Sequence, residues 1–135
     1  MNNKPVGELG EAAFHVRALK EHLVVSKPYG DSTKYDFVVD ATGVLYKIQI
    51  KATATKCKEG KTQEYYKFSV CHGSKEKRNY QKEEVDFIIC YVIPEDIWYV
   101  FPLEVLTSIT VKVRPWASTD EYVYEQYKEA WHLIK

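Results

Sequence analysis

One apolar segment in the second half of the chain limits the fold more than any other feature. Residues 86–93 read Asp-Phe-Ile-Ile-Cys-Tyr-Val-Ile, so that every side chain after the first is apolar or aromatic. Such side chains are typical of strands, and a strand that is apolar on both faces is covered by other layers on both sides. The sequence therefore predicts a sheet in which this segment is a central strand.

The segments around this strand predict the rest of the sheet. Residues 97–101 follow after Pro94-Glu95-Asp96, which predicts an antiparallel hairpin, and residues 102–106 predict a short helical turn. Ser118 and Glu121 form a capping box, which predicts a final helix that continues to about residue 134. Further strands are predicted over residues 23–27, 35–40, 44–51 and 65–71.

The N-terminal segment predicts a helix over residues 7–23. Its apolar side chains recur at spacings of three and four, which indicates one buried face made of Leu9, Ala12, Val16, Leu19 and Leu23. A neighbouring polar face carries Glu8, Glu11, His15 and His22. The order helix, strands, helix predicts a single domain over residues 1–135 of the α/β (α+β) class, with a mixed central β-sheet flanked by helices.

The charge balance excludes a strongly basic coat protein for nucleic acid, since 19 basic residues face 19 acidic ones, but it leaves local DNA binding open. No apolar run reaches the roughly 18 residues that span a membrane, and the N-terminus lacks the apolar core of a signal peptide. We therefore expect a cytoplasmic protein whose three cysteines, Cys57, Cys71 and Cys90, are reduced. A zinc site from these cysteines and His72 is disfavoured, because the sequence has no CxxC pair.

Polar side chains with a capacity for chemistry share one face of the strand predicted over residues 44–51. Gln49 and Lys51 lie on this face, opposite the apolar face that contains Ile50. If the strands over residues 35–40 and 44–51 pair around a turn at Thr42-Gly43, Asp36 lies beside Gln49 and Lys51, and Glu11 from the first helix completes the cluster. A divalent metal held by oxygen ligands neutralises charge at a phosphate, and a nearby lysine orients the attacking water. The cluster therefore predicts hydrolysis of a phosphodiester bond.

The same residues resemble a known family. Gly7-Glu8-Leu9-Gly10-Glu11 at the start of a helix, Tyr-Asp-Phe-Val-Val-Asp over residues 35–40, and Gln49-Ile50-Lys51 are similar to the motifs of the PD-(D/E)XK nuclease superfamily. The similarity is strongest to a small branch that includes the group I intron-encoded homing endonucleases of cyanobacteria, in which QxK replaces (D/E)xK. Residues 78–87 and 98–102 also resemble that branch, so the likeness covers residues 7–106.

The resemblance implies a restriction-endonuclease-like core and a site-specific endodeoxyribonuclease that cuts double-stranded DNA with Mg²⁺, for which Mn²⁺ would substitute. Glu11 and Asp36 would bind the metal with the backbone carbonyl of Ile50, and Glu8 would add charge from one turn away. Gln49 departs from the wider superfamily, because an amide supplies an oxygen without a negative charge. The implied catalytic residues are Glu11, Asp36, Gln49 and Lys51, with Lys51 acting at the attacking water.

Basic and polar side chains next to the site strand are predicted to contact DNA. They lie in two basic segments, residues 53–67 and residues 73–82, and Lys67 also belongs to the first. Both segments flank the strand, which places them near a phosphate in the site. The predicted contacts are Thr53, Lys56, Lys58, Lys61, Lys75, Lys77, Arg78, Asn79 and Tyr80.

The predicted C-terminal helix carries many aromatic side chains. Over residues 116–135 this composition favours packing on the domain or a subunit interface. A small nuclease needs two active sites to cut both strands, so we expect a homo-oligomer, either a dimer or a tetramer. The same fold also serves junction-resolving nucleases, restriction enzymes and, if Gln49 has abolished catalysis, DNA-binding modules without activity.

Overall fold

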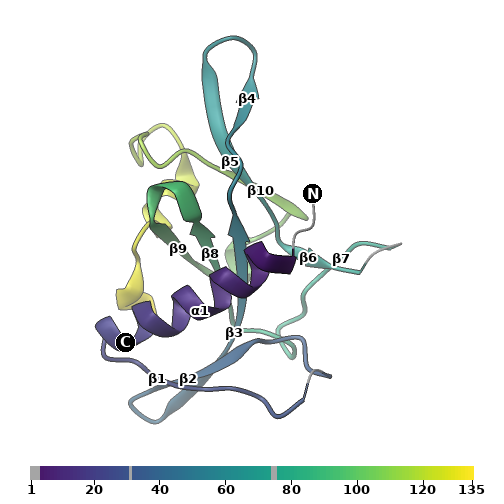
Figure 1. The fold of residues 1–135 in the computed structure, drawn as a ribbon, viewed down its shortest axis with the longest axis vertical. Helices are drawn as coiled ribbons and strands as arrows, with labels where there is room; N and C mark the ends of the chain where they lie inside the picture. The colour runs from purple at the N-terminus through teal and green to yellow at the C-terminus, as the bar shows by residue number, and fades with distance from the viewer. Residues whose placement is uncertain (1–3, 31, 74–75) are drawn as a thin grey trace.

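The structure is a computed structural model that describes residues 4–30, 32–73 and 76–135. Its strands form a five-stranded mixed sheet in the order β1-β2-β3-β8-β9, a three-stranded sheet in the order β10-β5-β4 and a two-stranded pair β6-β7 (Figure 1). In chain order the elements are α1 (Lys4–Lys20), β1 (Val24–Ser26), β2 (Phe37–Ala41), β3 (Val44–Thr53), β4 (Cys57–Glu59), β5 (Gln63–Ser69), β6 (Cys71–His72), β7 (Arg78–Asn79), β8 (Phe87–Val92), η1 (Ile93–Glu95), β9 (Ile97–Pro102), η2 (Leu103–Val105), β10 (Thr110–Val113), η3 (Val123–Tyr127) and η4 (Trp131–Leu133), where η marks a 3₁₀ turn. None of the helices in these residues is long and apolar enough to cross a membrane.

Strand β8 lies inside the five-stranded sheet, as its apolar sequence predicts. All six of its residues are buried. It runs parallel to β3 and forms the predicted antiparallel hairpin with β9. Helix α1 covers one face of this sheet, and the β10-β5-β4 sheet covers the other. A parallel pair requires a long connection, and the chain between β3 and β8 provides it through β4, β5, β6 and β7.

Strands β2 and β3 form the predicted hairpin around Thr42 and Gly43. Both turn residues have positive φ, 53° and 94°, as a two-residue type I′ turn requires. Ala41 pairs with Val44 directly across the turn, and Phe37 pairs with Ile48 at the other end. This register carries Asp36 to the level of Ile48 and Ile50, which is the arrangement the sequence predicts.

Helix α1 packs on the sheet through a face that the sequence analysis does not predict. The buried side of the helix consists of Gly10, Phe14 and Ala18. Most of the predicted buried face is exposed, since Leu9, Val16 and Leu19 each expose half or more of their surface. One large ring between two small residues lets the helix lie closer to the sheet than a row of long or branched side chains would. The predicted face is therefore wrong, apart from Leu23 beyond the helix end, which is buried.

The second sheet contains two strands, β4 and β10, that the sequence analysis misses. Strand β10 pairs with β5 and places Val111 and Val113 in the core, while Thr110 and Lys112 alternate with them. Both missed strands are short, so the alternation of apolar and polar residues within each is too brief to identify. Their pairing with β5 stabilises them in the fold.

The C-terminal segment is not the helix that Ser118 and Glu121 predict. Its regular structure is limited to the short turns η3 and η4, and the Ser118 hydroxyl contacts the Glu121 carboxylate at 3.3 Å. Glu129 has a φ of 54°, which interrupts a right-handed helix, and its N–H donates to the carbonyl of Trp98 on β9 at 2.7 Å. Contacts with β9 therefore override the local helix signal.

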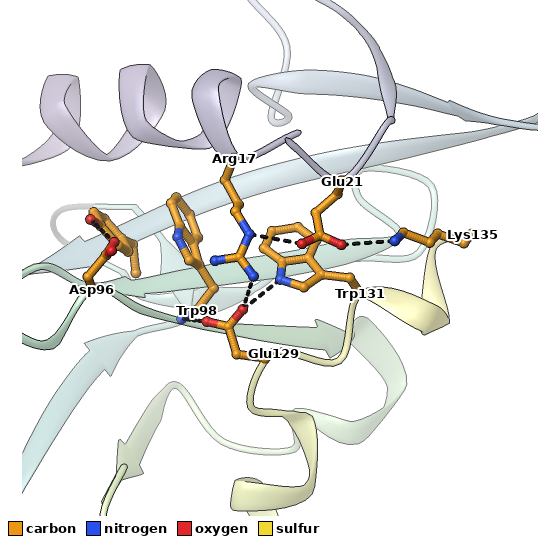
Figure 2. A network of polar contacts seen from close by, with 8 residues as sticks. Arg17, Glu21, Asp96, Trp98, Glu129, Trp131 and Lys135 are labelled. Atoms are coloured by element: carbon orange, nitrogen blue, oxygen red, sulfur yellow. Dashed lines mark hydrogen bonds and ion pairs between the residues drawn. The ribbon is translucent and has the colours of Figure 1, made fainter. Parts of the chain in front are cut away.

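A network of polar contacts attaches this segment to α1 and β9 (Figure 2). The carboxylate of Glu129 accepts hydrogen bonds from the N–H of Trp98 and from Nε1 of Trp131, each at 2.9 Å, and it forms an ion pair with Arg17. Arg17 also pairs with Glu21 at 3.0 Å, and its guanidinium lies 5.2 Å from the ring of Trp131. These side chains join the C-terminal end of α1 to the C-terminal segment of the chain.

Candidate active site

The candidate site begins where β2 ends. The ladder between β2 and β3 finishes at Phe37 and Ile48, and the N–H of Asp36 makes one further backbone bond to the carbonyl of Ile48 at 2.7 Å. Further along β3, the N–H of Ile50 donates to a side chain instead of to the backbone of a neighbouring strand. Its acceptor is Oδ2 of Asp36, at 2.8 Å. A carboxylate held in this way has a defined orientation next to the open edge of β3.

The carbonyl of Ile50 lies on the same edge. In a strand the N–H and the carbonyl of one residue point to the same side, so the Ile50 carbonyl faces the side on which Asp36 lies, past the end of β2. The side-chain Nε2 of Gln49 contacts it at 3.4 Å, which is long for a hydrogen bond. Asp36 and Ile50 therefore present oxygen atoms at neighbouring positions, as the resemblance implies.

Burial raises the pKa of Asp36 to about 6. The hydrogen bond from the Ile50 N–H opposes this shift, the nearby Glu11 carboxylate reinforces it, and the charges of Lys51 and Lys27 lower the pKa again. A carboxyl whose ionised form is poorly solvated gains from a cation that binds it. Perturbed carboxyls of this kind in a cleft are typical of functional sites.

Lys51 follows Ile50 on β3 and pairs with Cys90 of the adjacent strand β8. Its side chain lies on the face of β3 opposite to that of Ile50. Its Nζ donates to the carbonyl of Cys71 at 3.4 Å and lies 5.4 Å from the centre of the Tyr80 ring. Burial lowers the pKa of Lys51. The ammonium group is therefore partly desolvated and held from one side, which suits a role in orienting water and neutralising charge.

Glu11 reaches the site because α1 approaches β3 closely at Gly10. A Cβ on Gly10 would lie 2.8 Å from the Cβ of Ala52, so glycine is the residue that fits. Glu11 pairs with Lys27 at 3.4 Å, and its charge acts on Asp36. The sequence motifs predict the role of Glu11, but they give no role to Lys27 or to the close approach at Gly10. An isolated glycine inside a helical pattern was the available signal for Gly10.

All four predicted catalytic residues line one cleft of about 560 Å³. Its walls come from α1, β3, β5 and the end of β2, and they include Glu11, Asp36, Gln49, Ile50, Lys51 and Lys67. Glu8 lies instead on a neighbouring recess that it shares with Glu11, His15 and Lys27. The structure therefore brings the predicted catalytic set together and places Glu8 beside it.

The donors in the cleft fit a hard divalent cation. Mg²⁺ prefers one or two carboxylates together with carbonyl, amide and water oxygens, and Asp36, Glu11, the Ile50 carbonyl and the Gln49 amide are of these types. Among the described residues, no three His, Cys, Asp or Glu side chains form a metal cluster.

Predicted DNA contacts on the first basic segment lie around the cleft and on the β4–β5 hairpin, which extends away from the rest of the molecule (Figure 1). Thr53 lines the cleft. Lys58 lies on β4 and Lys61 in the turn, and both are exposed. Lys56 is exposed as well, with an ion pair to Glu64 at 3.4 Å. The three lysines are therefore accessible, and their contact with DNA stays a prediction.

The second basic segment has a less uniform placement. Lys77, Arg78 and Asn79 are exposed, and Arg78 pairs with Glu76 at 2.8 Å. Lys75 lies outside the described residues. Tyr80 is 7% exposed, with its ring beside the ammonium of Lys51. This burial does not fit the predicted contact of Tyr80 with DNA, because the ring packs in the apolar core.

An open strand edge, a carboxylate beside a backbone carbonyl and a partly buried lysine on one mixed sheet define a nuclease-like site. The sequence matches the PD-(D/E)XK endonuclease family over residues 1–134, and the chain belongs to this family. It is therefore a nuclease by family, and nucleases of this family generally use divalent metal ions. The membership that the sequence motifs predict is confirmed.

One solved structure supports the same assignment. The structure of a bacterial homing endonuclease, I-Ssp6803I, is similar over 99% of this chain and 93% of that chain, with a TM-score of 0.79 and 30% sequence identity. The structure of MepB is similar over 91% and 93% of the two chains, with a TM-score of 0.45 and 14% identity. No curated protein matches the sequence. The first similarity confirms the predicted mixed α+β fold and the predicted likeness to homing endonucleases.

Proposed function

We propose that the protein is a site-specific, Mg²⁺-dependent endodeoxyribonuclease that hydrolyses phosphodiester bonds in double-stranded DNA, with a role in intron homing. The observation that carries this proposal is the position of Asp36, whose Oδ2 is held by the Ile50 N–H in the cleft that Lys51 also lines. The homing role is supported by the similarity to I-Ssp6803I. We also propose a cytoplasmic location, which the similarity to a bacterial homing endonuclease supports.

The residues of the cleft would have two different roles in hydrolysis, metal binding and the orientation of water. Asp36, Glu11, the Ile50 carbonyl and the Gln49 amide would hold the metal, which neutralises phosphate charge and activates water when bound; Mn²⁺ would substitute. Lys51 orients the attacking water and stabilises the charge that develops on the phosphate. Because burial lowers its pKa, Lys51 exchanges protons more readily than an exposed lysine.

Cleavage of a diverse pool of genomic DNA tests this proposal directly. Discrete ends that require Mg²⁺ and disappear in Lys51→Ala and Asp36→Asn are the expected result, and they would also reveal the target. Both variants must keep the thermal unfolding behaviour of a folded domain. Folded wild-type protein that leaves the pool intact with both Mg²⁺ and Mn²⁺ would contradict the proposal.

The rival functions separate on the substrate and on Lys51. A junction-resolving nuclease would cut branched DNA and spare linear duplexes, while a restriction enzyme would cut at short palindromes. A DNA-binding module without catalysis is favoured only by Gln49, which lacks the charge of a carboxylate. Such a module would bind DNA equally well without metal and after Lys51→Ala.

We also propose that the protein acts as a homo-oligomer, a dimer or a tetramer. Each chain has one cleft of this composition in its described part, whereas cutting both strands requires two. The predicted interface over residues 116–135 stays a prediction: Trp131 is used in the chain's own core, while Trp116 and Val123 are exposed. Light scattering of the purified protein should give twice or four times the 15.8 kDa chain mass. A monomer that cuts both strands in one encounter would contradict the oligomer.

A further inference from the structure

The outer face of the β10-β5-β4 sheet carries a pair of like charges. Lys67 on β5 and Lys112 on β10 are direct cross-strand partners, and both are exposed. Tyr66 and Phe68 on either side of Lys67 are buried, so the lysine side chain lies on the face turned away from the core. The pair is visible only in the structure, because the sequence analysis misses strand β10.

Like charges directly opposite each other on paired strands are destabilising. Two surface carboxylates lie near this pair: Glu59 contacts Lys112 at 3.7 Å and Arg114 at 3.2 Å, and Glu121 shares a groove with Lys112 and Arg114. Among the described residues Lys67 has no ion-pair partner. The face therefore keeps an excess of positive charge that an anion outside the chain would neutralise.

The side chains around the pair hold Lys112 in place. Its Nζ lies 4.8 Å from the centre of the Tyr65 ring, over which the guanidinium of Arg114 also lies, at 5.6 Å. An ammonium held against an aromatic ring loses less conformational freedom when it binds an anion than a freely rotating one does. Lys112 is thus preorganised beside Lys67.

Lys67 connects this face to the candidate active site. It lines the same cleft as Asp36, Gln49 and Lys51, so an anionic polymer with one phosphate in the cleft has its next phosphates within reach of β5 and β10. We propose that the outer face of the β10-β5-β4 sheet binds the backbone of duplex DNA beside the scissile phosphate, with Lys67 and Lys112 as its phosphate ligands. This inference rests on the proposed function.

The salt dependence of DNA binding tests the inference, because each phosphate contact contributes a fixed slope. Binding of the full-length chain to a mixed-sequence duplex is measured in EDTA for wild type, Lys67→Gln, Lys112→Gln and the double variant. Between about 50 and about 200 mM salt, the loss of affinity should be about threefold smaller than that of wild type for each single variant and about tenfold smaller for the double variant. Lys67→Arg, which keeps the charge, should retain the wild-type slope.

Lys20→Gln is the matched control, since Lys20 is an exposed lysine on α1 outside the cleft, and it should leave the slope unchanged. The melting temperature of Lys67→Gln should equal or exceed that of wild type, because the substitution removes a like-charge contact. A wild-type slope in the double variant would overturn the inference and leave the proposed function intact. A wild type that binds no duplex in EDTA would also overturn the inference, whereas the proposed function falls only if the same protein leaves DNA uncut with Mg²⁺ and Mn²⁺.

Discussion

Two desolvated carboxyls, Asp36 in the cleft and Glu125 in the C-terminal segment, differ in what their oxygens contact. Burial raises the pKa of both groups. Glu125 is 2% exposed and uses both oxygens: Oε1 accepts the Tyr99 hydroxyl at 2.5 Å and Oε2 accepts the Arg114 N–H at 2.8 Å. Within the described chain, Asp36 uses only Oδ2.

The difference separates a carboxylate that completes the fold from one that receives a ligand. A buried polar atom without a hydrogen-bond partner destabilises a protein, so buried polar atoms with a purely structural role normally have such a partner. Asp36 keeps an oxygen free next to the cleft, with Glu11 and Lys51 as charged neighbours. Both carboxyls are desolvated, but the hydrogen bonds to Glu125 stabilise the C-terminal segment, whereas the second oxygen of Asp36 is left for a ligand.

Asp36→Asn should show the largest effect and separate the two roles. Cleavage should fall at least about 1000-fold, equivalent to about 4 kcal/mol, because the amide cannot supply the anionic ligand. In EDTA at neutral pH the variant should be more stable than wild type, by about 1–2 kcal/mol, since it removes a poorly solvated charge. A cleavage assay with Mg²⁺ measures the first effect, and urea unfolding in EDTA measures the second. A variant that is less stable than wild type would mean that Asp36 is structural in the way Glu125 is.

Glu125→Ala should have the opposite pattern, with a large loss of stability. Its removal leaves the Tyr99 hydroxyl and the Arg114 N–H without their acceptor, which should lower the free energy of unfolding by about 3 kcal/mol. Glu125→Gln keeps one acceptor and should lose less. Activity per folded molecule should be unchanged in both at a temperature where they are folded, and a specific loss of activity in Glu125→Gln would break the comparison.

Gly10→Ala tests how closely the helix must approach the cleft. The added methyl meets the Cβ of Ala52, so unfolding free energy should fall by about 1–3 kcal/mol, and activity should fall with the displacement of Glu11. Gly7→Ala on the same helix is the control, because a Cβ there has open space, and it should raise stability by up to about 1 kcal/mol. Equal changes in unfolding free energy for Gly10→Ala and Gly7→Ala would show that the close approach of α1 to β3 at Gly10 does not contribute to stability.

The pH dependence of stability should carry the smallest of these signals. The pKa of Asp36 is about 6 in the folded protein and near 3.8 in the unfolded chain, so the folded state holds the proton more strongly. Stability from this group is complete below pH about 4 and is lost as pH rises through about 6, by about 1–2 kcal/mol after screening by solvent. Glu125 shifts in the same direction, so the difference between wild type and Asp36→Asn isolates Asp36. Parallel pH profiles of the two proteins in EDTA would contradict the prediction.

The predictions made from the sequence succeed where neighbouring residues decide the structure. The turn at Thr42 and Gly43 sets the register of β2 and β3, and strand alternation then places Asp36 beside Gln49, Ile50 and Lys51. The apolar run of β8 identifies an interior strand for the same local reason. These parts of the site depend on residues fewer than twenty positions apart, so the pattern of side chains is enough to predict them.

Contacts between distant segments decided the rest. The stripe that α1 buries depends on which residues match the sheet surface, and Gly10 with Phe14 and Ala18 fit it better than the more regular apolar row. The capping box at Ser118 predicts a helix, but the free energy of bonding Glu125 and Glu129 to β9 and its surroundings exceeds what a marginal local helix provides.

The sequence by itself thus determined the family, the interior strand β8 and the grouping of Asp36, Gln49 and Lys51, which we propose to be catalytic. Only the tertiary structure decided that Lys112 stands opposite Lys67 and that Tyr80 supports Lys51 instead of facing solvent. The physical reason is that a hairpin encodes its register in a few adjacent residues, whereas the pairing of β5 with β10 and the packing of a side chain arise from the free energy of the whole fold.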